Sequence, residues 1–315
     1  MKFFSCDSRF SSCLKHRIIM ASMNQATLKK YIPTLPLGSG IYTFSAVDGK
    51  ILYTGKASNL KNRLNSYLKT NDHRIKRMLS SAKTLKFTET KSDIEALILE
   101  SQLIKKFRPQ FNIVMRDDKQ YFFVGFSKNK MPRIYLTHQP NSDRNIGPFT
   151  DGNALKTTLR FLRSVFPYCT CKTTHYNFCL NYHIGKCPGF CCLRTEATNE
   201  EKRTYSANIK AIIKILNGKK NSLVKDLAKD ADSAARRDDF EKAIGLRNKM
   251  EKLEKVFENA RTIRNSEIIK SHRSDLEALL KTRKPIIRIE GYDVSNIQGV
   301  HATGSMVTFI HGQPD

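Results

Sequence analysis

The sequence lacks any continuous run of about 18 apolar residues, so no segment of it is expected to cross a membrane. Its first 20 residues also lack the unbroken apolar segment and the small-residue cleavage site of a secretory signal. Neither an internal repeat nor a low-complexity tract is present. With 40% hydrophobic and 27% charged residues, the composition is typical of a globular protein, and we expect a cytoplasmic location.

Acidic residues are scarce, because 29 Asp and Glu face 55 Lys and Arg, which gives a net charge of +26. Between Lys50 and Arg116 there are 15 basic and only 5 acidic residues. A surface of this charge attracts polyanions such as nucleic acid. The alternative is a basic surface that serves only solubility or a ribosome-like setting. The charge therefore favours, without proving, contact with nucleic acid.

Strand and helix patterns predict a small α/β domain near the N-terminus. Two strands joined by an Asp48-Gly49 turn are followed by two short helices, a strand and a longer helix. The longer helix begins at a capping box formed by Ser92 and Glu95. The expected ranges are 41–45, 51–54, 59–68 with Ser58 as its cap, 73–82, 84–90 and 92–107. Short strands, a helix over 154–165 and a helical region from Thr198 to about Leu280 follow.

Five polar side chains of this domain are predicted to lie near one another. The strand pairing brings Tyr42 near Tyr53, and Arg63 lies four residues before Tyr67 on one helical face. Glu100 stands among leucines and isoleucines, where a carboxylate is unfavourable unless a cation or hydrogen-bond donors meet it. Taken singly, each residue has an ordinary structural interpretation, such as a half-buried strand tyrosine or a solvated charge.

Taken together, these residues resemble the GIY-YIG nuclease domain, and in particular its version in the UvrC family of bacterial excinuclease subunits. The stretches that carry the resemblance are GSGIYTF, ILYTGKASNLKNRLNSYLK and EALILESQLIKKFRPQFNI, within residues 38–113. The resemblance implies a catalytic set of two tyrosines, an arginine and a glutamate, with three supporting positions. These are Tyr42, Tyr53, Arg63 and Glu100, supported by Lys56, Tyr67 and Asn112.

The resemblance implies metal-dependent hydrolysis of a phosphodiester. Glu100 would hold Mg²⁺ or Mn²⁺, Arg63 would stabilise the charge of the transition state, and a tyrosinate would accept a proton from water. Which tyrosine is the base stays open. One residue departs from the family pattern, because Thr54 stands in the middle of the second motif where the family has isoleucine. We expect position 54 to be a packing position, so the catalytic tyrosine is retained.

Six of the eight cysteines lie within residues 169–192. Four of them are separated by seven, seven and three residues, and four thiolates suit an iron–sulfur cluster or a zinc site. Disulfides are the alternative, but they are not expected in a cytosolic protein. The stretch CLNYHIGKCPGFC resembles the UvrC cysteine region, which implies a [4Fe–4S] cluster. The expected ligands are Cys171, Cys179, Cys187 and Cys191, with Cys169 as a rival for the first, Cys192 spare, and His175 and His183 as ordinary loop residues.

Residues 222–258 are predicted to form two amphipathic helices joined by a polar turn at Arg237-Asp238-Asp239. A plain antiparallel helix pair within a larger core is one interpretation. The stretch DDFEKAIGLRNKMEKLE, however, resembles the UVR motif, through which UvrC docks on UvrB. Because so small a hairpin cannot bury its own apolar face, a partner is physically expected. Phe240 and Ile244 are the expected contact residues.

The last segment, residues 286–315, resembles the opening of the RNase H-like endonuclease domain of UvrC. The resemblance places the first catalytic aspartate of that second site at Asp293; without it, a strand-end aspartate in a turn would be the simpler interpretation. We expect a strand that ends at Gly291–Asp293 and a second strand over 305–310. Two strands alone should be disordered or loosely paired, and they lack the several carboxylates that two-metal 5′ incision needs.

The predicted fold class is therefore an α+β multidomain chain. Its parts are a tail (1–35), a small GIY-YIG α/β nuclease domain (36–114), a Cys-rich linker domain (115–197), a helical linker (198–221), the UVR helical hairpin (222–258), a second helical linker (259–285) and the truncated start of an RNase H-like domain (286–315).

The function implied by the resemblance is that of a nucleotide excision repair endonuclease subunit whose N-terminal half makes the 3′ incision. Its expected partners are damaged double-stranded DNA, UvrB through the hairpin and UvrA indirectly, and no membrane. One alternative is a non-catalytic scaffold that binds UvrB or DNA. Another is a stand-alone GIY-YIG endonuclease, but the cysteine region and the hairpin argue against it.

Overall fold

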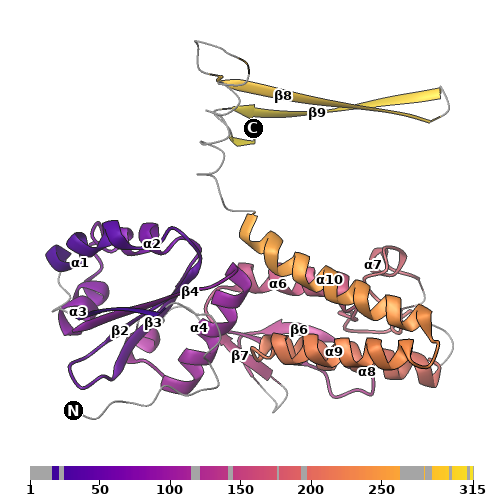
Figure 1. Cartoon of the computed structure of the whole chain (residues 1–315), viewed down its shortest axis with the longest axis horizontal. Helices are drawn as coiled ribbons and strands as arrows, with labels where there is room; N and C mark the ends of the chain where they lie inside the picture. The colour runs from indigo at the N-terminus through magenta and orange to yellow at the C-terminus, as the bar shows by residue number, and fades with distance from the viewer. Residues whose placement is uncertain are drawn as a thin grey trace. The chain divides into compact units, whose positions relative to one another are not determined.

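The computed structural model describes residues 16–20, 25–114, 121–140, 145–175, 177–192, 197–262, 280, 286–297, 300–310 and 313–314. The chain divides into two compact units, Met1–Arg261 and Thr262–Asp315, and each is described by itself. Figure 1 shows the chain and labels most of the helices and strands named below.

The N-terminal domain is built on a four-stranded antiparallel sheet in the order β1-β4-β2-β3. Its helices enclose one core together with the sheet, centred on Tyr42, Phe44 and Leu60. The elements are β1 His16–Met20, α1 Gln25–Tyr31, η2 Ile32–Thr34, β2 Gly40–Ser45, β3 Ile51–Ala57, α2 Leu60–Ser66, α3 His73–Ser81, β4 Thr84–Glu89, α4 Asp93–Phe107 and α5 Gln110–Val114.

The hairpin of β2 and β3 confirms the turn predicted from the sequence. Gly49 has a φ of 80°, a left-handed conformation that glycine adopts without steric strain. The register pairs Tyr42 with Gly55 and Phe44 with Tyr53. The two motif tyrosines consequently stand diagonally across neighbouring strands, with ring centroids 6.0 Å apart. The predicted proximity of Tyr42 and Tyr53 is therefore confirmed.

The prediction that residues 1–35 form a tail is wrong for the residues that the structure describes. Strand β1 pairs with β4 along its whole length, and α1 and η2 pack on the sheet. Leu28, Ile32 and Leu35 are buried in the domain core. The amphipathic pattern spans fewer than three helical turns here, which is too short for periodicity to distinguish a helix from an irregular segment.

The predicted cap of α2 is wrong by one residue. Asn59, not Ser58, is the N-cap, and its side chain accepts a hydrogen bond from the Asn62 N–H at 2.9 Å. Both residue types cap helices well, so composition does not choose between them. Ser58 instead donates to the Asp93 carboxylate at 2.9 Å, which ties the end of β3 to the start of α4.

Helix α4 begins at the predicted cap. The Ser92 hydroxyl accepts a hydrogen bond from the Glu95 N–H at 3.3 Å. The Glu95 carboxylate accepts from the Lys91 N–H at 3.0 Å, one residue before the amide that a capping box would engage. The helix ends at Phe107, and its C-cap Arg108, with a φ of 43°, breaks the helical path just before Pro109.

The middle domain has a three-stranded antiparallel sheet in the order β6-β5-β7, followed by three helices. Its elements are β5 Phe122–Phe126, β6 Ile134–Thr137, β7 Asn145–Phe149, α6 Gly152–Val165, α7 Leu180–His183 and α8 Asn199–Leu216. Helix α8 begins with a complete capping box of Thr198 and Glu201. The predicted strands and the predicted helix near 154–165 are confirmed.

Helix α4 is shared by the two domains. It packs on β2 and β3 of the first sheet, and it also packs on β7 and α6 of the middle domain. Its residues Ile94, Leu97 and Ile98 belong to the same hydrophobic cluster as Phe149 and Leu155. A helix that is covered on two sides is apolar on two faces, which explains the dense run of aliphatic residues around Glu100.

The helical hairpin consists of α9 Lys220–Ala235 and α10 Phe240–Thr262, joined at Asp238, which has a φ of 59°. Both predicted helices are present and extend beyond the predicted 222–258. One end of the hairpin is anchored in the core of the middle domain through Leu223, Leu253 and Phe257. The end near the turn stands apart from that core.

The second unit contains an antiparallel hairpin, β8 Arg288–Ile297 and β9 Val300–Ile310, with a short β10 Gln313–Pro314 beside β9. Both strands are longer than predicted. Strand β8 continues past Asp293, which pairs with Ser305, and β9 already begins at Val300. The expected disordered or loosely paired state differs from this ladder, which pairs every residue from Arg288 to Ser295 with β9 before the register shifts. Tyr292 and Met306 are exposed, as expected where a hairpin has no core to cover it.

Candidate active site and cysteine cluster

Tyr42 of β2 and Tyr53 of β3 meet Tyr67, which directly follows α2, in the core of the N-terminal domain. Tyr42 is fully buried, and its hydroxyl lies 2.6 Å from the hydroxyl of Tyr67. Gly55 makes this arrangement possible, because a Cβ at that position would lie 2.5 Å from the Tyr42 hydroxyl oxygen. The glycine of the second motif is therefore required by the side chain of the first, a relation that becomes visible only once the strand register is known.

Arg63 is held against this tyrosine cluster. Its Nε donates a hydrogen bond to the Tyr42 hydroxyl at 3.1 Å, and its guanidinium lies 5.3 Å from the centre of the Tyr67 ring. The oxygens around it, that of Tyr42 first, raise the pKa of the guanidinium above its ordinary value. Arg63 thus remains a fixed positive charge beside the phenols. The predicted juxtaposition of Arg63 and Tyr67 is present.

Burial raises the pKa of both motif tyrosines, Tyr42 and Tyr53, well above the ordinary value for a phenol, although Arg63 acts in the opposite direction. Neither tyrosine is therefore ionised near neutral pH by the protein alone. A cation bound next to the phenols is what would make a tyrosinate accessible. The tyrosine cluster is consequently suited to act together with a metal ion.

Glu100 is buried, with 3% of its surface exposed, and it faces the edge of β3. One carboxylate oxygen accepts a hydrogen bond from the Lys56 N–H at 3.0 Å, and the other accepts from the Thr150 hydroxyl at 2.5 Å. These donors supply the stabilisation that the sequence pattern required for a carboxylate in this position. A carboxylate oxygen is the kind of ligand that Mg²⁺ and Mn²⁺ prefer, so the donor type fits either ion.

Asn112 closes the domain onto β3. Its side-chain oxygen accepts from the Thr54 N–H and its amide donates to the Thr54 carbonyl oxygen, both at 2.8 Å. Asn112 therefore satisfies both backbone groups of the residue between Tyr53 and Gly55. Thr54 is fully buried, which confirms position 54 as a packing position, and its hydroxyl has no hydrogen-bond partner.

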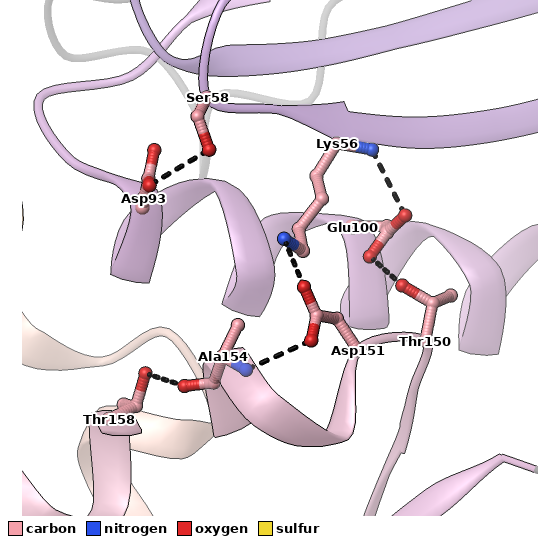
Figure 2. A network of polar contacts seen from close by, with 8 residues as sticks. All are labelled: Lys56, Ser58, Asp93, Glu100, Thr150, Asp151, Ala154 and Thr158. Atoms are coloured by element: carbon pink, nitrogen blue, oxygen red, sulfur yellow. Dashed lines mark hydrogen bonds and ion pairs between the residues drawn. The ribbon is translucent and has the colours of Figure 1, made fainter. Parts of the chain in front are cut away.

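Two residues of the middle domain that the sequence did not suggest reach the same place. Thr150 and Asp151 lie between β7 and α6, and Figure 2 shows them beside Glu100 and Lys56. The Lys56 ammonium pairs with the Asp151 carboxylate at 2.9 Å. Asp151 also caps α6, since it accepts from the Ala154 N–H at 2.9 Å. An aspartate before a helix is a cap signal that the sequence contains. The sequence does not indicate that Thr150 contacts Glu100, 50 positions earlier, or that Asp151 contacts Lys56, 95 positions earlier.

The cysteines of the middle domain converge in two adjoining groups of metal-ligating atoms within the described residues. Cys169, Cys187 and Cys191 form one group, and Cys171, His175 and Cys191 form the other. Arg163 brings the first group together, because its Nε donates to the carbonyl oxygens of Tyr168 and Lys186, which directly precede Cys169 and Cys187. The sulfurs of Cys169 and Cys187 are 3.3 Å apart.

The placement differs from the predicted ligand set at two positions. Cys179 belongs to neither group, and it precedes the short helix α7 instead. Cys169, which was expected only as a rival of Cys171 for the first ligand, takes part together with Cys171. His175 was expected to be an ordinary loop residue, yet its Nε2 lies 3.3 Å from the Cys171 sulfur. Its Nδ1 lies 2.7 Å from the Asn177 carbonyl oxygen, which can only accept, so in the neutral imidazole Nε2 is the nitrogen that carries the lone pair.

The thiols influence one another's ionisation. The hydrogen bond between Cys169 and Cys187 lowers the pKa of the Cys187 thiol and raises that of the Cys169 thiol. Burial raises the pKa of the Cys191 thiol. Closely spaced thiolates repel one another, so the group ionises fully only around a cation. A set of several sulfurs within 4.8 Å therefore fits a metal or an iron–sulfur cluster.

The two residues predicted to bind a partner lie on the surface of α10 near the hairpin turn. Phe240 is 60% exposed and Ile244 is 59% exposed. They are four residues apart and so lie on one face of the helix. Asp293, the predicted residue of a second site, lies on β8, and its side chain is outside the described residues. In the described part of the chain, every helix is too short or too polar to span a membrane.

Three segments match domains of one family. Residues 38–113 match the UvrC-like GIY-YIG domain, residues 121–215 the middle domain of the UvrC/Cho excinuclease, and residues 277–315 the UvrC RNase H endonuclease domain. The first match confirms the expected GIY-YIG fold of the N-terminal domain. The mixed α/β content is likewise as expected.

Two relatives that match three quarters or more of this chain share one name. The UvrABC system protein C of Chlorobaculum tepidum is 34% identical over 253 residues, which cover 76% of this chain and 40% of that protein. That of Syntrophomonas wolfei is 34% identical over 83% of this chain and 43% of its own length. The chain thus spans about two fifths of the length of the relatives it matches.

A solved structure is similar over the N-terminal domain. It is the N-terminal GIY-YIG endonuclease domain of UvrC from Thermotoga maritima, bound to magnesium as its catalytic divalent cation. Its sequence identity is 38%, and the similarity covers 27% of this chain and 96% of that one, with a TM-score of 0.26.

Proposed function

The chain belongs to the UvrC family, and from that membership and the geometry of its first domain we propose that it is a DNA endonuclease subunit of nucleotide excision repair. The N-terminal domain would make the incision on the 3′ side of a lesion. Because the chain spans only part of its relatives, this activity is proposed from the residues it does contain. The observation that carries the proposal is the convergence of Tyr42, Arg63 and Glu100 around the β2–β3 hairpin.

Each of these residues has a role that its surroundings support. Arg63 is a permanent cation fixed by the Tyr42 hydroxyl, in a position to stabilise the charge that develops on a phosphate during hydrolysis. Glu100 would hold one Mg²⁺ or Mn²⁺. Such an ion, when bound, would stabilise phosphate oxygens and make water and the neighbouring phenols more acidic. Tyr42 or Tyr53 would then accept the proton of the attacking water.

The substrate proposed is double-stranded DNA that carries damage, recognised together with UvrA and UvrB. The basic excess around the site, 15 Lys and Arg against 5 Asp and Glu over residues 50–116, supports contact with a phosphate backbone. Lys61, Lys69, Arg74 and Arg77 are among the basic residues that lie on α2, on α3 or between β3 and β4.

A nicking assay tests this proposal. The chain is added with UvrA, UvrB and Mg²⁺ to a duplex that carries one defined lesion. The proposal expects a single metal-dependent incision on the 3′ side, which requires UvrB. No incision with DNA binding retained would support the scaffold alternative, and incision that needs neither UvrB nor a lesion would support a stand-alone endonuclease.

The cysteine groups are proposed to hold a [4Fe–4S] cluster, or Zn²⁺ as the alternative. The sequence favours Cys171, Cys179, Cys187 and Cys191 as ligands, and the placement favours Cys169 in the position of Cys179. The support is the number of sulfurs that approach one another and the way Arg163 holds the two segments that bear them. The site would be structural, since it lies in the middle domain and is built from residues 169–191.

The hairpin of α9 and α10 is proposed to dock on UvrB through the exposed face of Phe240 and Ile244. Its other end is buried in the middle domain, so the hairpin is anchored at the base and free to present its turn. Two large apolar side chains four residues apart on one helix match the way amphipathic helices engage a partner's groove.

Replacing both Phe240 and Ile244 by serine is expected to weaken binding to UvrB by at least about tenfold. The variant lacks the apolar surface that these two side chains would bury in the complex. Binding is measured by calorimetry with purified UvrB. Val47→Ser is the control, since Val47 is an exposed apolar residue at the β2–β3 turn, away from the hairpin of α9 and α10. Unchanged affinity in the double variant, with normal folding by circular dichroism, would contradict the docking role.

A further inference from the structure

The β7–α6 corner reaches the proposed active site from a different domain. Thr150 and Asp151 stand at the end of β7, whose last residue Phe149 is fully buried, and at the start of α6. Figure 2 shows the corner approaching Glu100 on α4 and Lys56 on β3. Three elements of two domains thus meet at one carboxylate. The corner makes its contacts through side chains, because the Thr150 hydroxyl reaches Glu100 and the Asp151 carboxylate reaches Lys56.

The corner is fixed by its own packing. Asp151 caps α6 through the Ala154 N–H with one oxygen and pairs with Lys56 through the other. Burial alone would raise the pKa of Asp151, but its partners, Ala154 first, lower it, so the carboxylate stays ionised. Gly152 packs so closely on β5 that a Cβ would lie 2.4 Å from the Phe122 ring. Thr150 is therefore presented to Glu100 by a rigid support.

The Thr150 hydroxyl holds one of the two oxygens of Glu100, at 2.5 Å, while the Lys56 N–H holds the other. Together these donors fix the rotation of the carboxylate about its last bond. A metal ligand whose orientation is fixed in advance loses little entropy when it binds, and groups that orient a ligand contribute strongly to affinity. A glutamate held on only one oxygen would be free to turn away.

We propose that Thr150 of the middle domain is a positioning residue for Glu100, so that the metal site of the N-terminal domain is completed by the β7–α6 corner. This inference rests on the proposed role of Glu100 as the metal ligand. The ion pair of Lys56 with Asp151 serves the same end, because it keeps the Lys56 ammonium directed at the corner. The 3′ incision site is consequently assembled by both domains.

The test measures the affinity of the whole chain for Mn²⁺ in the absence of DNA. The concentration of free Mn²⁺ is read from its electron paramagnetic resonance signal. Thr150→Val removes the hydroxyl with little change of shape, and Mn²⁺ affinity is expected to fall by about 10- to 100-fold, as for other residues that orient a metal ligand. Thr150→Ser restores the hydroxyl and should bind within about threefold of the unmodified chain, since the donor is again present. The nicking rate at saturating Mn²⁺ should recover in Thr150→Val, whereas the metal concentration for half-maximal rate should rise.

Thr158→Val is the matched control. Thr158 is equally part of the middle domain, is buried, and donates to the Ala154 carbonyl oxygen at 2.8 Å inside α6. Its variant should bind Mn²⁺ as the unmodified chain does. If Thr150→Val binds Mn²⁺ as tightly as Thr158→Val, the positioning role is wrong. If instead Glu100→Gln leaves Mn²⁺ binding unchanged, the proposed function of Glu100 fails, whatever Thr150→Val does.

Discussion

Glu100→Gln is expected to abolish metal-dependent nicking, with a loss of at least about a thousandfold, on the order of 4 kcal/mol of transition-state stabilisation. Glutamine has the shape of glutamate but no charge, so it is a poor ligand for a hard divalent cation. Its amide oxygen can still accept from the Lys56 N–H, and the Thr150 hydroxyl can rotate to accept from its amide. The fold should therefore survive the substitution.

The measurement is the single-turnover incision rate on the lesion duplex, with DNA affinity taken from fluorescence anisotropy. DNA affinity should change by less than about threefold, because phosphate contacts are made by the basic surface and not by Glu100. Glu95→Gln is the control on the same helix, where Glu95 accepts from the Lys91 N–H and pairs with Lys220 at 3.5 Å, away from the tyrosine cluster. A Glu100→Gln variant that cuts within about tenfold of the unmodified chain would show that the proposed site is wrong.

Cys191→Ser is expected to empty the cysteine site. Chain purified without oxygen should be brown, with absorption in the visible and about four irons, as thiolate-held [4Fe–4S] clusters are. Cys191 is common to both groups of ligating atoms, and a serine hydroxyl is a much weaker ligand than a thiolate. The variant should be colourless and should melt at a lower temperature, because metal binding of this kind is coupled to folding.

Two further variants decide whether Cys169 or Cys179 is the fourth ligand beside Cys171, Cys187 and Cys191. The placement of the side chains predicts that Cys169→Ser loses the metal and Cys179→Ser keeps it, whereas the spacing in the sequence predicts the reverse for Cys179. Cys192→Ser is the control, since Cys192 is buried next to Cys191 but belongs to neither group. One zinc per chain and no colour would place the site in the structural zinc class. Folded protein without metal would exclude both.

The tyrosine hairpin shows what local sequence can determine. An Asp-Gly turn sets the register of the two strands, and a register sets which side chains are neighbours. Tyr42 and Tyr53 were therefore predictable as a pair, and Arg63 and Tyr67 followed from helical spacing. Glu100 was recognisable because a carboxylate among apolar residues is unfavourable unless a cation or hydrogen-bond donors meet it. The resemblance to the UvrC family assigned roles to these positions that the spacing alone could not.

The errors in the sequence prediction share a cause. Leu28 and Ile32 were assigned to a tail because a short amphipathic stretch is indistinguishable from an irregular one until something covers it. Ser58 and Asn59 cap helices about equally well, and the contact between Ser58 and Asp93 decided between them. Cys179 has the expected spacing from Cys187, but spacing does not determine how a loop turns. In each case a long-range contact made the choice.

The sequence by itself determined the elements of the N-terminal domain between Gly40 and Phe107 and the identity of its chemical groups, because turns, caps and periodicity act over a few residues. Only the tertiary structure decided what surrounds those groups. It placed a second sheet on the far face of α4, brought Thr150 to Glu100 across 50 positions, and gathered Cys169 with Cys187 through Arg163. Such contacts join residues that are distant in the sequence, and no local pattern of residues encodes which of them will meet.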